Sequence, residues 1–246
     1  MLNKLVVILL FTFSALSPCV EAYQSWNRVF LASYPRSGNH WARYLIEEAS
    51  QITTSSVYCD WDPQHQPTPF PWGGYSIVGG YTGTARFPTL AEMVVIKTHY
   101  PAHSLQGFDA LPYVKTIRIV RDPIDSFYSF YVYVNGEQSP HFKLPRANID
   151  QYIKSWRLFQ EYWNQQGSVL TIRYEDLYKD PYRYLKQIME TLGYAVTDAD
   201  ILRAIAKYPP RGGLQNRLKH YSKHDLKEIK DKLKDLLKQF HYHIHE

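Results

Sequence analysis

The fold is indicated first by one stretch of the chain, Ala32-Ser-Tyr-Pro-Arg-Ser-Gly-Asn-His-Trp41. It follows the apolar segment Arg28-Val-Phe-Leu31 and leads into Ala42-Arg-Tyr-Leu-Ile-Glu-Glu-Ala49. This order predicts a buried strand, a tight turn marked by Pro35 and Gly38, and then a helix. Backbone N–H groups at the start of a helix have no partner inside it, and the helix dipole is positive there. The turn is therefore typical of a site that binds a phosphate or a similar anion.

Two side chains of this turn fit an anion site. Arg36 supplies a positive charge, and Ser37 supplies a hydroxyl group. The stretch lacks the G-x-x-x-x-G-K-[ST] spacing of loops that bind ATP or GTP, and Trp41 stands where the G-K-[ST] part of that motif would be. A P-loop kinase is therefore disfavoured.

Length and composition indicate one globular domain. The chain has 246 residues, of which 45% are hydrophobic and 21% charged, and no linker-like tract divides it. These proportions are typical of a folded protein with one sizeable core. The formal net charge of +5 favours anionic ligands without identifying one, and no nucleic-acid partner is expected.

The N-terminus predicts entry into the secretory pathway, with the protein in the Golgi lumen or secreted. Lys4 precedes the apolar run Leu5–Leu16, and Val20-Glu-Ala22 ends in small residues, so residues 1–22 are expected to form a cleaved signal peptide. An uncleaved anchor is the weaker alternative, because the run is shorter than the ~20 residues that span a bilayer. Cleavage would remove Cys19 and leave Cys59 alone, so no internal disulfide is expected.

Beyond the first helix, apolar runs alternate with segments of helical pattern. Short runs rich in β-branched residues predict buried strands at Val29–Ser33, Met93–Ile96, Thr116–Val120 and Val169–Arg173. Helices are predicted at about His40–Ser50, Pro123–Val134, Ile149–Gln165 and Pro181–Leu192, and from Ser222 onward. This alternation predicts an α/β fold of three layers, in which helices flank a parallel sheet on both faces. Ligands of such sheets bind at the carboxyl ends of the strands, where the sequence places Arg36, Lys97, His99 and Arg121.

The segment from Tyr58 to Pro88 shows no sustained periodicity and is rich in Pro, Gly and aromatic residues. It predicts a long ordered loop that could roof a cleft, and a surface excursion packed by its own aromatic rings is equally compatible. Its part from Trp61 to Tyr81 could line a pocket for a phenol, a sugar or a peptide tyrosine. The acceptor and the oligomeric state stay open at this point.

Four motifs in a fixed order resemble a known enzyme family. They are Tyr34-Pro-Arg-Ser-Gly-Asn-His-Trp41, Lys97-Thr-His-Tyr-Pro101, Arg121 with Ser129 eight residues later, and Tyr174-Glu-Asp-Leu177 followed by Asp180-Pro181. Together they resemble the sulfotransferases that use 3′-phosphoadenosine 5′-phosphosulfate (PAPS). The first motif is most similar to the WSC-domain-containing branch, without a WSC module. The resemblance implies a P-loop NTPase-like sulfotransferase fold over residues 23–246 and transfer of a sulfuryl group to a hydroxyl or amine.

The resemblance also implies a role for each motif. Arg36 would assist the leaving phosphate, Lys97 would contact the sulfuryl oxygens, and His99 would act as the general base, for which imidazole is suited near neutral pH. The product would be 3′,5′-adenosine bisphosphate (PAP), and no metal ion is implied. The implied nucleotide-binding residues are Arg36, Ser37, Gly38, Asn39, His40, Trp41, Arg121, Ser129, Tyr174, Arg211 and Gly213.

Three departures from the family pattern stand out. Arg36 replaces a lysine, and its planar guanidinium is a less compact charge. Asn39 and His40 occupy two positions that are usually threonine. Arg211-Gly-Gly213 matches only part of a phosphate-binding R-K-G-x-x-G segment.

Two alternatives remain beside the enzyme. The departures leave room for a secreted relative that binds a nucleotide or a sulfated glycan without catalysis. The interleaved charges between Lys219 and Lys238 predict an exposed helix face, with a heparin-like or membrane-binding role as the minor alternative. The adjacent Glu47 and Glu48 are expected on a solvated helix face rather than in a catalytic site.

Overall fold

The computed structural model describes residues 26–59, 67–103, 112–136, 138–166, 169–210 and 217–244. Residues 1–22, which the sequence predicts as a signal peptide, lie outside this part of the chain, and so do Arg211 and Gly213. No helix in the described part is long and apolar enough to cross a membrane.

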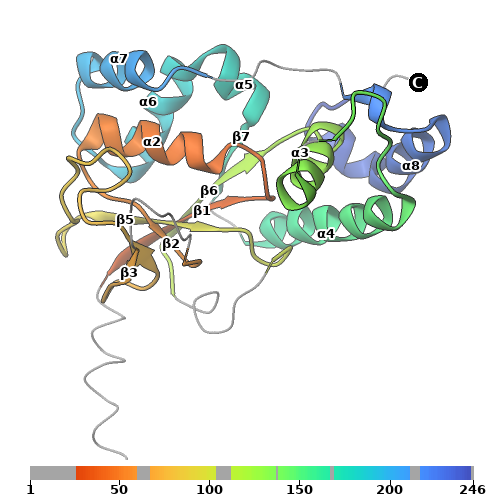
Figure 1. Cartoon of the computed structure of the whole chain (residues 1–246). Helices are drawn as coiled ribbons and strands as arrows, with labels where there is room; N and C mark the ends of the chain where they lie inside the picture. Colours follow the sequence, from red (N-terminus) through yellow and green to blue (C-terminus); the bar gives the residue numbers. More distant parts are fainter. Residues whose placement is uncertain are drawn as a thin grey trace, which may run out of the picture.

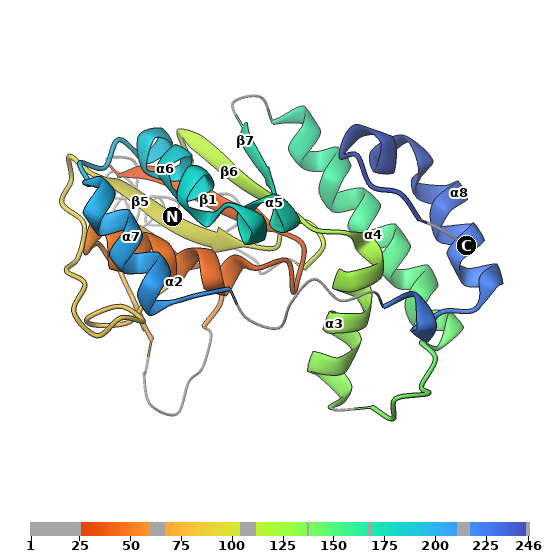
Figure 2. The same ribbon diagram turned by 90° about the horizontal axis from the view of Figure 1, so that it is seen from above.

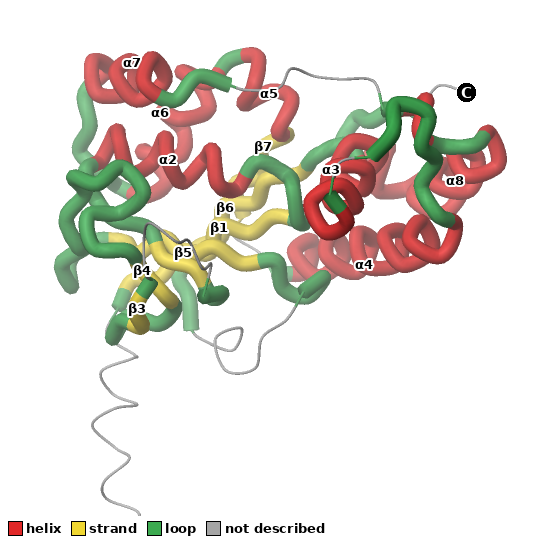
Figure 3. Tube along the Cα trace, in the orientation of Figure 1, coloured by secondary structure: helices red, strands yellow, loops and turns green. Residues whose placement is uncertain are grey.

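A seven-stranded sheet forms the middle of the molecule (Figure 1; yellow in Figure 3). The strands lie in the order β3-β4-β2-β5-β1-β6-β7, and the five from β2 to β7 are parallel, whereas β4 and β3 pair antiparallel at one edge. Their bounds are β1 Asn27–Ser33, β2 Ser55–Ser56, β3 Thr68–Pro69, β4 Tyr75–Ser76, β5 Met93–Thr98, β6 Lys115–Val120 and β7 Val169–Arg173. The predicted α/β fold with a parallel sheet is confirmed, and the antiparallel edge is an addition to it.

Helices cover both faces of the sheet, as Figure 2 shows from above. Their bounds are α2 Asn39–Ser50, α3 Pro123–Asn135, α4 Arg146–Gln165, α5 Tyr174–Lys179, α6 Pro181–Leu192, α7 Asp198–Lys207 and α8 Lys223–Gln239, with a 3₁₀ turn η1 at Leu218–His220. Helices α4 and α8 run side by side on one face of the sheet, and α2, α6 and α7 lie on the opposite face (Figures 1 and 2).

Alternation along β1 divides the apolar residues into two cores. Val29 and Leu31 pack with residues of α2, α5, α6 and α7, whereas Phe30 and Ala32 pack with residues of α3, α4 and α8. Successive side chains of a strand point to opposite faces of the sheet, so alternate residues of β1 contribute to the two cores. The middle strand is therefore buried on both faces, as the continuous apolar run predicts.

The register of the sheet gathers the ends of three strands at one edge. Ala32 of β1 pairs with Thr98 of β5, and Ser33 pairs with Ile119 of β6. The residues that follow these strands therefore emerge together, and they include the 34–38 turn, His99 and Arg121. This edge carries the candidate site.

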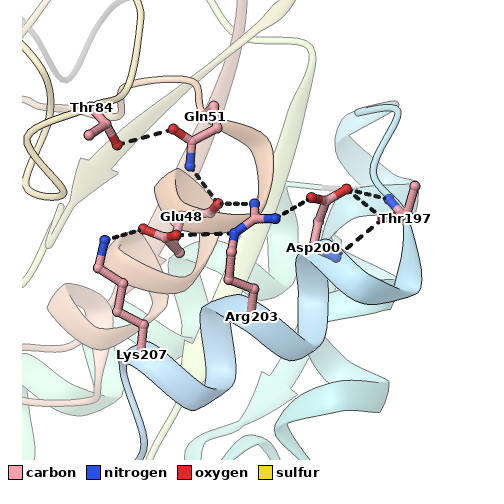
Figure 4. Close-up of polar contacts among 7 residues, drawn as sticks. All are labelled: Glu48, Gln51, Thr84, Thr197, Asp200, Arg203 and Lys207. Carbon is pink, nitrogen blue, oxygen red and sulfur yellow. Dashed lines mark hydrogen bonds and ion pairs between the residues drawn. The ribbon is translucent and has the colours of Figure 1, made fainter.

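The prediction for Glu47 and Glu48 is wrong. Both residues are buried, at 0% and 4% exposure: residues Thr54 and Tyr81 contact the carboxylate of Glu47, and α7 packs against α2 over Glu48. Glu48 accepts from Arg203 Nε at 3.2 Å and from Lys207 Nζ at 2.9 Å (Figure 4). Burial raises the pKa of Glu47, against hydrogen bonds to its Oε1 from the backbone N–H and hydroxyl of Thr54. These two acids join α2 to its neighbours.

Candidate active site

The turn between β1 and α2 is held in an unusual backbone conformation. Arg36 has φ 64° and Gly38 has φ 91°, both in the left-handed region. Gly38 is also the N-cap of α2, with no side chain of its own to accept the helix amides. The first amides of α2 therefore need an outside acceptor, as the sequence predicted for an anion site.

Arg36 and Ser129 meet across this turn. The Arg36 Nε donates to Ser129 Oγ on α3 at 3.3 Å, and its guanidinium carbon lies 4.9 Å from the centre of the Tyr133 ring. Arg36 itself is exposed to solvent. The structure thus brings together the first and third motifs of the sequence.

Arg121 closes the other side of the turn. Its Nη1 donates to the Arg36 backbone carbonyl at 2.8 Å, and its guanidinium carbon lies 4.6 Å from the centre of the Tyr174 ring. Asp125 pairs with it at 3.7 Å. The Arg121 Nε is buried and finds no hydrogen-bond partner among the described residues. A buried donor in this state is costly, so the site has a place for an added acceptor.

Ser37 and Asn39 face the protein interior. The Ser37 hydroxyl is fully buried and has no hydrogen-bond partner in the described part of the chain. Asn39 Nδ2 donates to the Leu31 carbonyl at 3.0 Å and to Ser33 Oγ at 3.2 Å. The amide group of Asn39 therefore braces the start of α2 against the end of β1.

His99 follows the end of β5 and is fixed in one tautomer. Its Nδ1 lies 2.6 Å from the Ser33 backbone oxygen, which can only accept, so Nδ1 carries the proton. The imidazole stacks on the Tyr58 ring, with centroids 5.4 Å apart and planes at 24°. The Tyr58 hydroxyl also accepts from the His99 backbone N–H at 3.0 Å. In this tautomer Nε2 of His99 is the basic nitrogen.

Lys97 lies two residues before His99, within β5, and is 4% exposed. Its Nζ donates to His40 Nε2 at 3.2 Å and lies 5.5 Å from the centre of the Tyr58 ring. Lys97 and His99 are both in contact with Tyr58, a residue that the sequence reasoning did not single out.

The rings of Trp41 and Tyr174 contact each other, and Tyr174 lies against Gly38. Their rings meet edge to face, with centroids 6.2 Å apart. Trp41 Nε1 donates to the Tyr208 carbonyl at 2.9 Å, just beyond α7. The family resemblance implied that both residues bind the nucleotide, and the structure shows that both rings also contact protein groups.

A cavity of about 680 Å³ is lined by most of these residues, although Ser37 and Ser129 are not among those that line it. It is lined by predicted residues, namely Arg36, Gly38, Asn39, His40, Trp41, Lys97, His99, Arg121 and Tyr174. It is also lined by residues that the motifs do not contain, namely Pro35, Tyr44, Tyr58, Cys59, Tyr81, His103, Phe130 and Tyr133. Tyr58, Cys59 and Tyr81 come from the loop that was expected either to roof a cleft or to pack on itself. No Asp or Glu is among these lining residues.

The comparison with known proteins identifies the domain. The family model of the sulfotransferase domain matches residues 27–243. A WSCD family member from Drosophila pseudoobscura pseudoobscura, GA21586, is 30% identical over an alignment of 190 residues that covers 70% of this chain and 52% of the relative. Sulfotransferase 1A1 from Bos taurus is 24% identical, with 85% of this chain and 73% of that protein covered. The chain spans about half the length of the first two curated relatives that it matches, which are both WSCD family members.

Solved structures agree with this assignment at the level of the fold. Mouse sulfotransferase SULT7A1, solved in complex with PAP, superposes with a TM-score of 0.56 at 22% identity, covering 91% of this chain and 92% of the mouse protein. Sulfotransferase STF9 from Mycobacterium avium has a TM-score of 0.57 at 13% identity, over 93% of this chain and 81% of that protein. The resemblance that the four motifs indicated is confirmed: the chain belongs to the sulfotransferase domain family, with relatives in the WSCD branch.

Proposed function

We propose that this protein transfers a sulfuryl group from PAPS to a hydroxyl or amine acceptor. The observation that carries the proposal is that His99 and Lys97 open into the same cavity as Arg36 and Arg121. A proton acceptor, an ammonium and two guanidinium groups thus surround one space of about 680 Å³. Transfer of an anionic group between two oxygens needs such fixed charges more than it needs a covalent intermediate.

The polar atoms of the cavity fit the nucleotide that the family uses. Arg121 lines the cavity, and its buried Nε lacks a partner among the described residues; a phosphate oxygen is an acceptor that such a donor takes. Arg121 and Ser129 would hold the 3′-phosphate, and the amides at the start of α2 would hold the 5′-phosphate. Trp41 and Tyr174 would receive the adenine. The PAP complex of the mouse neighbour supports this choice of nucleotide.

The His99 tautomer suits the role of general base. Because Ser33 occupies Nδ1, Nε2 keeps a lone pair that can take the proton of the acceptor hydroxyl. As that proton leaves, the acceptor oxygen forms a bond to sulfur, and the bond from sulfur to the bridging phosphate oxygen breaks. Arg36 and the α2 amides neutralise the charge that grows on the leaving phosphate, and Lys97 faces the charge on the sulfuryl oxygens. The products are the sulfated acceptor, PAP and protonated His99.

The proposal is tested first by calorimetric titration with PAP, with 5′-AMP as the control. We expect micromolar binding of PAP and much weaker binding of AMP, because only PAP carries the phosphate that Arg121 would hold. Transfer from ³⁵S-labelled PAPS to a panel of phenols, sugars and tyrosine peptides then identifies the acceptor. Equal binding of PAP and AMP, or no binding of either, would overturn the proposal.

A further inference from the structure

His40 stands at the second residue of α2, where the family motif usually has a threonine. Its imidazole does not stand alone, because Nε2 lies 3.2 Å from Nζ of Lys97 on β5. An ammonium group has donors only, so His40 must be the acceptor in this bond and must carry its own proton on Nδ1. The pair joins the phosphate-binding turn to the strand that bears the base.

The hydrogen bond to His40 gives the Lys97 ammonium a defined direction. Its side chain is a flexible four-carbon stem that ends in a charge with rotating donors. It is 4% exposed, so its ammonium has exchanged most of its water for protein neighbours. One of these is the Tyr58 ring, whose centre is 5.5 Å from Nζ, and a ring face attracts a cation without fixing the direction of its N–H groups. A hydrogen bond to His40 does fix that direction.

His40 is in turn held by its surroundings. Its ring packs against the ring of Tyr81, with centroids 5.9 Å apart. The Tyr81 backbone N–H donates to Oε2 of the fully buried Glu47 at 2.6 Å, and the guanidinium of Arg43 lies over the Tyr81 ring at 4.5 Å. Glu47, Arg43 and His40 all belong to α2. His40, which accepts the hydrogen bond from Lys97, therefore lies on α2, the helix whose first amides form the candidate anion site.

We propose that His40 is a positioning residue that acts through Lys97. It holds the ammonium so that one N–H bonds to the imidazole and the others point into the cavity toward the sulfuryl oxygens. This inference rests on the proposed function, because it concerns the sulfuryl-bearing end of the same site. It gives the histidine at this position a task that differs from the phosphate contact the motif implies.

The test is a double-mutant cycle on donor binding, which needs no knowledge of the acceptor. Affinities for PAPS and for PAP are measured by calorimetry for the wild type, His40→Ala, Lys97→Ala and the double variant. Only PAPS carries the group that Lys97 would contact, so His40→Ala should weaken PAPS binding about tenfold, the equivalent of about 1.4 kcal/mol, and change PAP binding less than about twofold. In the Lys97→Ala background, His40→Ala should have no further effect on PAPS.

Two further variants separate positioning from structural damage. His40→Gln keeps a side-chain acceptor and should recover most of the PAPS affinity that His40→Ala loses. His224→Ala is the matched control, since His224 is also the second residue of a helix, is exposed on α8, and should leave both affinities unchanged. Circular dichroism spectra of all variants would test whether each one is folded.

The outcomes distinguish the two proposals. If the wild type binds neither PAPS nor PAP, the proposed function fails. If the wild type binds both but His40→Ala weakens PAPS equally with and without Lys97, His40 acts on the nucleotide directly and the inference is overturned. Loss of PAP binding in His40→Ala, or no recovery in His40→Gln, would overturn it as well.

Discussion

A Cβ atom on Gly38 would lie 2.4 Å from Cδ2 of Tyr174, closer than side-chain atoms approach one another. Gly38 also has φ 91°, which only glycine adopts without strain. The phosphate-binding turn is therefore pressed directly onto the ring that lies beneath Arg121. Any side chain at this position would force the turn and the Tyr174 ring apart.

Gly38→Ala should therefore weaken PAP binding about tenfold or more, since 1.4 kcal/mol already corresponds to tenfold. The displaced turn no longer aims the first amides of α2 at the phosphate. Gly193→Ala is the matched control, because Gly193 also has a positive φ of 68° but its added Cβ meets nothing within 4 Å. It should lower the melting temperature and leave the Kd for PAP unchanged. Equal PAP affinities in wild type and Gly38→Ala would contradict the close fit.

His99→Ala should lower kcat by roughly 10²- to 10⁴-fold, the usual contribution of a positioned general base. PAP binding should stay within about twofold of the wild type, because the proposed function places the imidazole beside the acceptor, and its Nδ1 bonds to the Ser33 carbonyl. Labelled PAPS in single-turnover assays measures the chemical step, and calorimetry measures the binding. A variant that keeps full turnover would remove His99 from the mechanism.

Arg121→Ala should remove the preference for PAP over 5′-AMP. Hydrogen bonds to charged groups contribute about 1.5–3 kcal/mol, so a loss of roughly ten- to a hundredfold in PAP affinity is expected. AMP binding should change little, because AMP lacks the 3′-phosphate. Titrations of the variant with both nucleotides measure the ratio. A parallel loss of both affinities would show instead that Arg121 acts by holding the Arg36 carbonyl.

The elements of the parallel sheet and its main helices were predictable because their signals are local. Continuous β-branched runs marked β5, β6 and β7, and Pro123 and Gly193 marked one helix start and one helix end where the structure has them. The strand β2 at Ser55–Ser56 could not be found in this way, since two serines carry no apolar pattern. Helix α7 did have a signal, the capping box of Thr197 and Asp200, which the sequence reasoning passed over.

The site was predictable as far as it lies in short motifs next to strand ends. Arg36, His99 and Arg121 follow strands, and Lys97 is the next-to-last residue of β5, so the sheet register brings all four to one edge. The contacts of Tyr58 and Tyr81 depend on the path of a long loop, which a single sequence does not define. The burial of Glu48 depends on α7, which returns to α2 more than a hundred and fifty residues later in the chain. Such contacts are tertiary and leave no local pattern.

The carboxyl group of Asp122 makes the stability of the fold fall as the pH rises, whereas a carboxylate with a lowered pKa makes stability fall as the pH drops. Burial and the neighbouring Asp125 raise the pKa of Asp122 to about 7, although its side chain accepts from the Ile124 N–H at the start of α3. The folded state therefore binds this proton more tightly than the unfolded state. Its contribution to stability is complete below the ordinary pKa of 3.8 and is lost as the pH rises toward 7.

Asp122→Asn should accordingly raise the melting temperature at pH 8 and leave it nearly unchanged at pH 4, because the amide keeps the cap and never ionises. A gain of about 2–4 °C is expected for each kcal/mol recovered.

Asp200→Asn is the contrasting variant. Hydrogen bonds from Thr197 lower the pKa of Asp200 to about 2, so its contribution to stability is present above pH 3.8 and is lost as the pH falls toward 2. That variant should melt lower than the wild type at pH 7. Thermal unfolding of the wild type and both variants between about pH 2 and pH 8 measures the two trends. A destabilised Asp122→Asn at pH 8 would show that the ionised carboxylate stabilises α3.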